Sequence, residues 1–391
     1  MINRSLIAKN FKRFLPLFFS LILLSSAVVY AVVSTPVTII QGGSLASGYS
    51  YIIFRIDSTY YARNGLTGAI DYTSINASFL VLSIISSLSS TGGNIYFKNA
   101  EYKMDATLVG SDGVNFLGES PWSSASEGVK FVWEKAIVGI DFTGVRDARI
   151  EGICLDGSSV GTIAVNVGGT RTTIMNVNIY SWTDVALRFY DVNQFYGEKI
   201  YIITGNSAIE SSGGYFDHST FVSCTFLAEE TNIIYGSGIS FIGCDFTHTG
   251  LPTSGYGTQI VGNETTVSFT SCIFENNVAG LANYISITGC AGVSFISTRF
   301  YGSAGSSYTP TNAHVLIRDT PGIYSVKGVI FQGCDFANTG IVNIRIDEAA
   351  AGKIVGVTGI GCTFLGSIVS DVSNAVKFIN CYANGTVWNY P

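Results

Sequence analysis

One short pattern of hydrophobic and polar positions recurs along the second half of the chain. It reads aromatic, two residues, cysteine, one residue, aromatic, and occurs at Phe221–Phe226, Phe241–Phe246, Phe269–Phe274 and Phe331–Phe336. A copy at Phe295–Phe300 has threonine in place of cysteine, and degenerate copies occur at Gly359–Phe364 and Phe378–Tyr382. The steps from one Cys or Thr to the next are 20, 28, 26, 36, 28 and 19 residues. A constant pattern with connections of variable length is typical of a solenoid.

Each copy is interpreted as two short strands joined by a corner. In the copy at 331–336, Val329 and Phe331 lie two residues apart and point to one side. Gly333 allows a sharp bend, and Cys334 and Phe336 share a side on the second strand. Apolar pairs before the copies supply a third strand, at 233–234, 260–261, 285/287, 315/317 and 344/346. Three strands per turn predict an all-β, right-handed parallel β-helix, with weaker early coils at 150–155, 174–179 and 195–200. About ten coils are expected, stacked about 4.8 Å apart.

Six of the eight cysteines occupy the same position of the pattern, here called the ladder position: Cys224, Cys244, Cys272, Cys334, Cys362 and Cys381. Stacked coils would place them one above another inside, with parallel Cα–Cβ vectors. Neighbouring Cβ atoms would then stay farther apart than the ~3.8 Å of a disulfide. We therefore predict buried thiols that act as small hydrophobic side chains. Cys154 is one residue out of phase, and Cys290 falls in a different strand. No CxxC pair occurs and the three histidines are scattered, so no metal site is expected.

Composition and charge are consistent with a long internal column of apolar side chains. The chain has 391 residues, of which 44 are glycine and only 12% are charged. The formal net charge is −6, but Arg4, Lys9, Lys12 and Arg13 precede the apolar run at residues 14–33 and no acidic residue does, so the remainder carries 17 basic and 27 acidic residues. A net acidic surface argues against a nucleic-acid partner, and none is expected.

The first 34 residues have the composition of an export signal. Residues 1–13 are basic and residues 14–33 are almost wholly apolar. That run is long for a signal peptide and long enough for a membrane span, so a cleaved signal and a transmembrane anchor both stay open. In either case the remainder should be exported, to the cell surface or the extracellular space. Three sequons, at Asn76, Asn263 and Asn384, are compatible with glycosylation.

Residues 35–74 are expected to form a spacer and a hairpin, and residues 75–391 the β-helix domain. The spacer is rich in Ser, Gly and Thr, and residues 51–57 and 59–63 fit two hairpin strands. Residues 79–88 show helical recurrence of apolar positions, with Ser74 and Asn76 as candidate N-caps. We expect this helix to cover one end of the solenoid, where strand edges would otherwise be open.

This helix, the segment Thr91–Met104 and the segment Val114–Glu119 together resemble the entry of the pectate-lyase-like superfamily of right-handed parallel β-helices. Arg149–Gly157 is similar to the strand of that group that ends in Asp-Gly. The superfamily includes pectate lyases, polygalacturonases and many phage tailspike proteins. The resemblance covers about residues 75–381, rests on core and turn positions, and implies a fold rather than a chemistry. The polygalacturonase motifs Asn-Thr-Asp, Asp-Asp, Gly-His-Gly and Arg-Ile-Lys are absent.

The local candidates for catalysis are Arg318, Asp319, Arg345 and Asp347. Each Asp lies 15 residues before a ladder cysteine, and equal offsets predict that they lie on adjacent coils, roughly 5 Å apart. That spacing suits a retaining glycosidase pair, or half of a calcium site if the protein is a lyase. No cofactor is otherwise expected. The alternative is a pair of exposed turn residues that Arg318 and Arg345 neutralise.

Tyr180 and Trp182 are the densest spot of aromatic side chains predicted to face outward. Exposed aromatic faces stack on sugar rings, so the two residues are candidates for carbohydrate binding. Packing of loops against the wall of the solenoid explains them equally well.

Two hypotheses of function follow from these observations. The first is a non-catalytic structural or carbohydrate-interacting surface protein, with a polysaccharide or a cell-envelope component as partner and a membrane contact through the N-terminal segment. The alternative is a polysaccharide lyase or glycoside hydrolase with a diverged active site. The enzyme predicts acids and bases gathered along one sheet, whereas the structural protein predicts neutral outer faces with small polar side chains.

Overall fold

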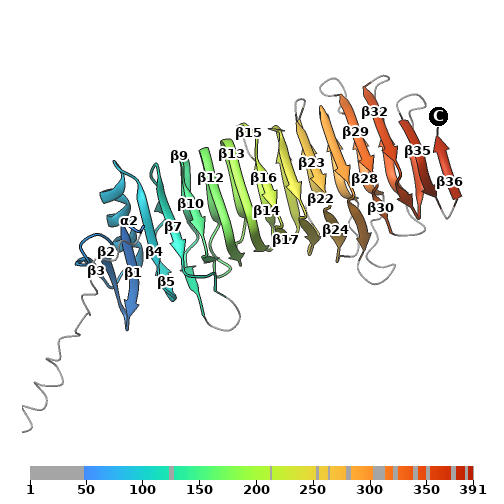
Figure 1. Cartoon of the computed structure of the whole chain (residues 1–391). Coiled ribbons are helices and arrows are strands. Elements are labelled where there is room, and N and C mark those ends of the chain that lie inside the picture. Colours follow the sequence, from blue (N-terminus) through green and yellow to red (C-terminus); the bar gives the residue numbers. More distant parts are fainter. Residues whose placement is uncertain are drawn as a thin grey trace, which may run out of the picture. The chain divides into compact units, whose positions relative to one another are not determined.

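The computed structural model describes residues 48–122, 127–211, 214–251, 255–262, 265–278, 283–302, 313–319, 325–337, 342–348, 353–370, 376–383 and 386–390. Most strands in this part of the chain pair in parallel with the strands one coil earlier and one coil later. Figure 1 shows them side by side from β4 to β35. The predicted all-β parallel β-helix of about ten coils is confirmed.

Three parallel sheets make up the helix. They are called sheets I, II and III, in the order in which a coil crosses them. Sheet I contains β4 (Gly93–Phe97), β7 (Val114–Gly118), β10 (Arg149–Glu151), β16 (Thr220–Val222), β20 (Ile239–Ile242), β23 (Thr266–Thr270), β26 (Gly292–Ile296), β29 (Val326–Gln332), β32 (Ile354–Ile360) and β35 (Val376–Ala383). Sheet II contains β5 (Ala100–Met104), β8 (Val129–Trp133), β11 (Cys154–Asp156), β17 (Thr225–Ala228), β21 (Asp245–His248), β24 (Ile273–Asn276), β27 (Arg299–Gly302), β30 (Asp335–Phe336) and β33 (Thr363–Phe364).

Sheet III contains β6 (Leu108–Val109), β9 (Val138–Arg146), β14 (Ser207–Ser211), β18 (Glu230–Ile234), β22 (Tyr256–Val261), β25 (Asn283–Thr288), β28 (Ala313–Arg318), β31 (Val342–Asp347) and β34 (Ser367–Ser370). Two short strands, β15 (Phe216–Asp217) and β19 (Gly236–Ser237), lie where sheet III passes into sheet I. The long strands β12 (Ile163–Tyr180) and β13 (Val185–Ile203) bend through all three sheets. At the C-terminal end, β36 (Thr386–Tyr390) pairs antiparallel with β35.

Phenylalanine rings stack from coil to coil in the interior. In sheet I the rings of Phe241, Phe269 and Phe295 follow one another with centroids 5.1 and 5.0 Å apart. In sheet II the rings of Phe246 and Phe274 stack at 4.7 Å. The two columns meet edge to face, as at Phe241 and Phe246, whose centroids are 5.2 Å apart. The recurring pattern therefore builds the predicted internal column of aromatic side chains.

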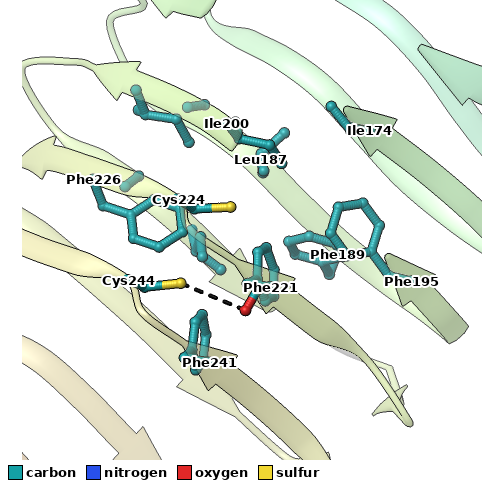
Figure 2. Packing of buried hydrophobic residues seen from close by; sticks show 14 of the residues in the cluster. Ile174, Leu187, Phe189, Phe195, Ile200, Phe221, Cys224, Phe226, Phe241 and Cys244 are labelled. Carbon is teal, nitrogen blue, oxygen red and sulfur yellow. Dashed lines mark hydrogen bonds between the residues drawn. The ribbon is translucent and has the colours of Figure 1, made fainter. Parts of the chain in front are cut away.

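All eight cysteines are buried and none is in a disulfide. The Cys244 thiol donates to the carbonyl oxygen of Phe221 one coil earlier at 3.5 Å, a contact drawn in Figure 2. Cys272 makes the corresponding contact with Phe241 at 3.4 Å. Thr298, which stands in the same position, donates its hydroxyl to the carbonyl oxygen of Phe269 at 3.1 Å. In these coils the ladder position thus holds a small buried side chain that donates a hydrogen bond, whereas the equivalent position of two earlier coils holds buried Val177 and Ile200.

The corner between sheets I and II is one residue with a left-handed backbone. Its φ angle is 52° at Ser223, 61° at Gly243, 54° at Ser271, 51° at Ser297 and 60° at Gly333. The bend turns the chain between two strands whose side chains face a common interior. This corner is the one predicted from the Gly or Ser before each ladder cysteine.

The early coils follow the same frame, with one correction. Ile150 pairs with Ile174 as predicted, but in the next coil Gly197 rather than Phe195 pairs with Phe221. A Cβ atom at Gly197 would lie 2.9 Å from the Phe195 ring. The Phe195 ring therefore fills the space that a side chain at position 197 would need, and the pattern in this coil begins two residues later than predicted.

The N-terminal part of the described chain begins with three antiparallel strands and a helix. Strands β1 (Tyr51–Ile56) and β2 (Thr59–Asn64) form the predicted hairpin, and β3 (Ile70–Ser74) pairs with β2. Helix α2 (Ala77–Leu88) begins two residues before the predicted start. Asn76 is its N-cap, since the side-chain oxygen accepts the Phe79 N–H at 2.9 Å. The apolar side of α2 packs against β2, β3, β5 and β6.

Within the described ranges, no helix is both long enough and apolar enough to cross a bilayer. The apolar run at 14–33, on which the predictions of a signal peptide and of an anchor depend, lies outside the described residues. The sequons at Asn263 and Asn384 also lie outside them.

Candidate functional site

Polar side chains form a continuous outward row along the first half of sheet III. These residues pair consecutively from coil to coil and are called the polar row: Asp141, Asn166, Arg188, Glu210, Asn232 and Gln259. They face outward because the preceding positions, such as Val165, Leu187 and Ile209, are fully buried. The polar row therefore presents one charged or amide side chain per coil along the helix axis.

Arg188 is the centre of the polar row. Its Nη2 donates to Asp184 Oδ2 at 2.9 Å and to Glu210 Oε2 at 3.3 Å. Both carboxylates contact the same nitrogen, so their oxygens lie within about 6 Å of each other. On a neighbouring coil, Asn232 Nδ2 donates to Glu230 Oε1 at 2.8 Å. Ion-paired carboxylates and an amide are strong hydrogen-bonding groups, so this arrangement suits the binding of hydroxyl groups.

The predicted pairing of Asp319 with Asp347 is wrong. Arg318, not Asp319, is the register partner of Asp347. The segment that connects β28 to β29 is one residue longer than the segment that connects β31 to β32, so equal offsets from the cysteines do not give equal positions. Asp319 is buried, with 5% of its surface exposed, whereas Asp347 lies on the outer face. The two carboxylates do not form the expected pair across one corner.

The arginines of this group are engaged with other side chains. Arg345 Nε contacts Asp347 Oδ1 at 2.9 Å and Oδ2 at 3.1 Å. The Arg318 guanidinium lies over the Tyr256 ring, 5.1 Å from its centroid, and its Nε is 3.4 Å from Thr288 Oγ1. Asp347 with Arg345 fits the alternative of a neutralised outer carboxylate, whereas the buried Asp319 does not fit it.

Trp182 does not offer a face to a ligand, which corrects the prediction of an exposed aromatic. Its side chain is 1% exposed and its Nε1 donates to the carbonyl oxygen of Leu155 at 3.2 Å. Cβ atoms at Gly139, Gly157 and Gly161 would lie 2.6 to 2.7 Å from the indole ring. Three glycines thus leave the space that the ring fills. Spacing along the sequence did not reveal that these glycines meet one tryptophan.

Tyr180 is half-buried and packs edge to face on Tyr201, with ring centroids 6.0 Å apart. Burial raises the pKa of its hydroxyl to about 12. Without an exposed partner in Trp182, Tyr180 alone does not make the predicted stacking surface. Its part in carbohydrate binding remains a prediction.

A second cluster of charged side chains, on the outer face of sheet II, was missed by the sequence analysis. Asp245 accepts a hydrogen bond from Thr247 Oγ1 at 3.1 Å, and Glu275 accepts one from the Tyr301 hydroxyl at 3.3 Å. Glu275 pairs with Thr247 and with Tyr301 in the two neighbouring strands. Arg299 lies over the Tyr301 ring, 5.1 Å from its centroid. Members of this cluster on neighbouring coils are about thirty residues apart in sequence, so only the coil register brings them together.

The two acids of this cluster are shifted in the same direction. Burial raises the pKa of the Asp245 carboxyl. Burial, and next the charge of Asp245, raise the pKa of the Glu275 carboxyl. Both carboxyls are therefore more easily protonated than a carboxyl exposed to solvent.

From β16 to β26, the outer face of sheet I carries no charged side chain. Thr220, Ser240, Ser268 and Ser294 are consecutive partners there. A hollow of about 280 Å³ runs along these strands, lined mostly by serine, threonine, glycine and short apolar side chains. This part of sheet I thus matches the face expected of a structural protein, while sheets II and III carry charged groups of the kind expected of an enzyme or a binding protein.

Asn76 and Ser78 of the first sequon both have structural contacts. Asn76 Nδ2 donates to Asp105 Oδ2 at 2.9 Å, and the Ser78 hydroxyl accepts the Asp105 N–H at 2.8 Å. Glycosylation at Asn76 remains a prediction. Across the described residues, no group of three or more His, Cys, Asp or Glu side chains is arranged to hold a metal ion.

The parallel pairing from coil to coil defines a β-helix, the fold that the resemblance to the pectate-lyase-like superfamily implied. No protein-family model matches the chain, and no curated protein matches it. Among solved structures, it is similar to the tailspike of Acinetobacter phage vb_AbaP_AS12, with 12% identity and a TM-score of 0.50 over 78% of this chain and 60% of that one.

Two further similarities are weaker. One is to a tailspike of Acinetobacter baumannii bacteriophage Fri1, described as a capsular polysaccharide depolymerase, with 14% identity and a TM-score of 0.47 over 79% of this chain and 60% of that one. The other is to the catalytic domain of a GH87 alpha-1,3-glucanase, with 11% identity and a TM-score of 0.48 over 78% and 66%. The chain spans about 60% of the length of each tailspike. Identities this low establish the fold alone.

Proposed function

We propose that this chain is an exported surface protein that binds a polysaccharide along the outer face of sheet III without cleaving it. The polar row is the observation that carries this proposal. Because the fold hosts many functions, the site and not the fold must support the function.

The spacing of the polar row suits an extended sugar polymer. Successive coils lie about 4.8 Å apart, close to the length of one sugar unit. A polysaccharide parallel to the helix axis would therefore meet an equivalent hydrogen-bonding side chain at each coil. Of the charged members, Arg188 is paired with Glu210 and also with Asp184, which lies outside the row. Asp141 accepts hydrogen bonds from the Thr143 N–H and hydroxyl. These charged side chains can orient the hydroxyl groups of a sugar by hydrogen bonding.

Affinity electrophoresis of the full chain in gels that contain acidic or neutral polysaccharides tests the proposal. We expect retardation by at least one polymer and a loss of about tenfold in affinity for Arg188→Ala, which corresponds to about 1.4 kcal/mol. Arg171→Ala is the matched control, because Arg171 also forms an exposed ion pair, with Asp147, but lies outside the polar row. Free migration in every gel would contradict the proposal.

A glycoside hydrolase is the second candidate, and the cluster at Asp245 and Glu275 favours it. Two carboxyls with raised pKa values on adjacent strands are the type of pair that such enzymes use as acid and base or nucleophile. Release of reducing ends from a polysaccharide, lost in both Asp245→Asn and Glu275→Gln, would establish it. Release of unsaturated sugar ends that requires Ca²⁺ would instead identify a lyase. If no polymer tested yields either product, the binding protein stays the proposed function.

Export is part of the proposal and is supported by the basic and apolar composition of residues 1–34. N-terminal sequencing of the mature protein, together with membrane fractionation, distinguishes a cleaved signal peptide from a retained anchor. Mass analysis of the same material reports glycans at Asn76, Asn263 or Asn384. Recovery of the intact chain in the cytosol would contradict export.

A further inference from the structure

Three exposed tyrosines lie beside the polar row, on successive coils. Tyr190, Tyr215 and Tyr235 have 48%, 72% and 49% of their surface exposed. Tyr190 follows Arg188 by two residues in β13, so both side chains project from the same face of sheet III. Strands β15 and β19 pair Phe216 with Gly236, which places Tyr215 and Tyr235 in register one coil apart. Together the three residues are called the tyrosine platform.

The backbone holds the tyrosine platform in place. The Tyr215 carbonyl accepts the Val192 N–H at 2.7 Å, and the Tyr235 N–H donates to the Val261 carbonyl at 2.9 Å. A Cβ atom at Gly262 would lie 2.9 Å from Cδ1 of Tyr235. The absence of a side chain at Gly262 therefore lets the Tyr235 ring lie against the next coil.

Exposed tyrosines at this density are not explained by packing of the interior. The neighbouring positions that point inward, Phe189 and Phe216, are almost fully buried and supply the core contacts of these coils. An aromatic patch bordered by polar side chains is typical of a binding surface. Aromatic rings with a polar hydroxyl suit sugars, whose C–H faces stack on the ring while their hydroxyl groups form hydrogen bonds.

The charges around the tyrosine platform favour a neutral polymer. Arg188 is the cation beside it, and two carboxylates, Asp184 and Glu210, already contact its guanidinium. Asp191 is also exposed at this edge. A polyuronate brings one carboxylate per sugar, so it would place like charges next to this acidic surface with no unpaired arginine to meet them.

We infer that the ligand is a neutral polysaccharide and that Tyr190, Tyr215 and Tyr235 stack on its sugar rings. This inference rests on the proposed function, and it adds the class of polymer and the residues that hold it. Because the tyrosines repeat coil by coil, as the polar row does, one polymer chain along the axis contacts both sets of side chains.

Affinity electrophoresis of the full chain against neutral glucans, mannans and galactans, and against polygalacturonate and alginate, tests this inference. We expect at least tenfold tighter binding of one neutral polymer, with little dependence on salt, because no net charge is neutralised. Tyr215→Ala and Tyr235→Ala should each weaken binding about fivefold to tenfold, and Tyr215→Phe should retain most of it. Tyr382→Ala is the matched control, because Tyr382 is 50% exposed but lies in β35, far along the chain from the platform. An unchanged urea midpoint for each variant shows that it is folded.

The possible failures are distinguishable. Tighter binding of a polyuronate, weakened by salt, would overturn the neutral class while leaving a polysaccharide-binding protein. Binding of a neutral polymer that Tyr215→Ala and Tyr235→Ala leave unchanged would overturn the tyrosine platform alone. Binding of no polymer at all would overturn the proposed function together with this inference.

Discussion

At the scale of single residues, the ladder position of the later coils combines a small buried side chain with a hydrogen-bond donor. Cysteine and threonine both bring a small side chain and a donor to a buried main-chain carbonyl, at 3.4 Å for Cys272 and 3.1 Å for Thr298. Burial also acts on the acidity of the two cysteines outside the ladder position. It raises the pKa of Cys290, as that of Cys154, to about 12.

Thr298→Val tests the donor requirement at constant shape. It leaves the carbonyl of Phe269 without its 3.1 Å donor, so we expect a loss of about 1 to 2 kcal/mol of unfolding free energy. Thr298→Cys keeps a donor and should cost less than about 0.5 kcal/mol. Urea unfolding curves of both variants give the comparison. Equal losses would mean that only volume matters at this position.

Trp182→Ala tests how much stability comes from packing the indole into the space that three glycines leave, Gly139, Gly157 and Gly161. Removing a buried indole leaves a cavity and should cost about 3 to 5 kcal/mol of unfolding free energy. Trp122→Ala is the control, because Trp122 is only half-buried. The Lys130 ammonium lies over its ring, 6.0 Å from the ring centroid. Urea unfolding followed by circular dichroism measures both. A similar, small loss in the two variants would contradict the packing role of Trp182.

At the scale of secondary-structure elements, the corner from sheet II to sheet III buries two histidines. His248 ends β21 and His314 lies near the start of β28. The His314 ring stacks on the Tyr284 ring with centroids 4.7 Å apart. Burial lowers the pKa of His248 to about 4 and that of His314 to about 3. Both side chains are therefore neutral in the folded protein down to acidic pH.

These histidines predict loss of stability in acid. In the unfolded chain a histidine has a pKa of about 6.5, so between that value and the lowered folded values the unfolded state binds more protons. Stability is fully present above about pH 6.5 and falls as the pH drops toward 4 and 3. We expect a loss of a few kcal/mol between pH 7.5 and pH 5 in urea titrations. His248→Gln should reduce this dependence, and a pH profile identical to that of the unaltered chain would contradict the assignment.

Asp245 and Glu275 on sheet II predict the opposite dependence of folding stability on pH. Because burial raises the pKa of Asp245 and Glu275, the folded state holds their protons more tightly, and this contribution is lost as the pH rises through the raised values. Asp245→Asn should therefore increase the urea midpoint at pH 7 but hardly change it at pH 4. Asp112→Asn is the control of opposite sign, because hydrogen bonds from Arg146 lower the pKa of Asp112. A lower midpoint for Asp245→Asn at pH 7 would contradict the argument.

At the scale of the whole molecule, a parallel β-helix must cover the interior of its first coil. Leu80, Val81 and Ile84 of α2 are buried against the first strands. Ile84→Asp should expose that interior and cause concentration-dependent association, visible by light scattering. Ser86→Asp on the exposed side of α2 is the control and should remain unassociated. Equal behaviour of the two variants would show that α2 does not protect the end of the helix.

Much of this architecture could be predicted from the sequence by itself. A side chain that points inward in one coil meets its counterpart in the next, so the aromatic and cysteine positions repeat and reveal the fold. The corner at Ser223 and the cap at Asn76 were predictable because a bend and a helix start depend on a few adjacent residues.

Only the tertiary structure decided which outward side chains become neighbours. The connections between coils vary in length, and the single extra residue after β28 moved Asp319 out of line with Asp347. The same coil register brought Arg188 to Glu210, and Glu275 to Tyr301, across more than twenty residues of sequence. Outward positions carry no packing constraint that repeats along the chain, so their partners follow from loop length and register, which the hydrophobic pattern does not encode.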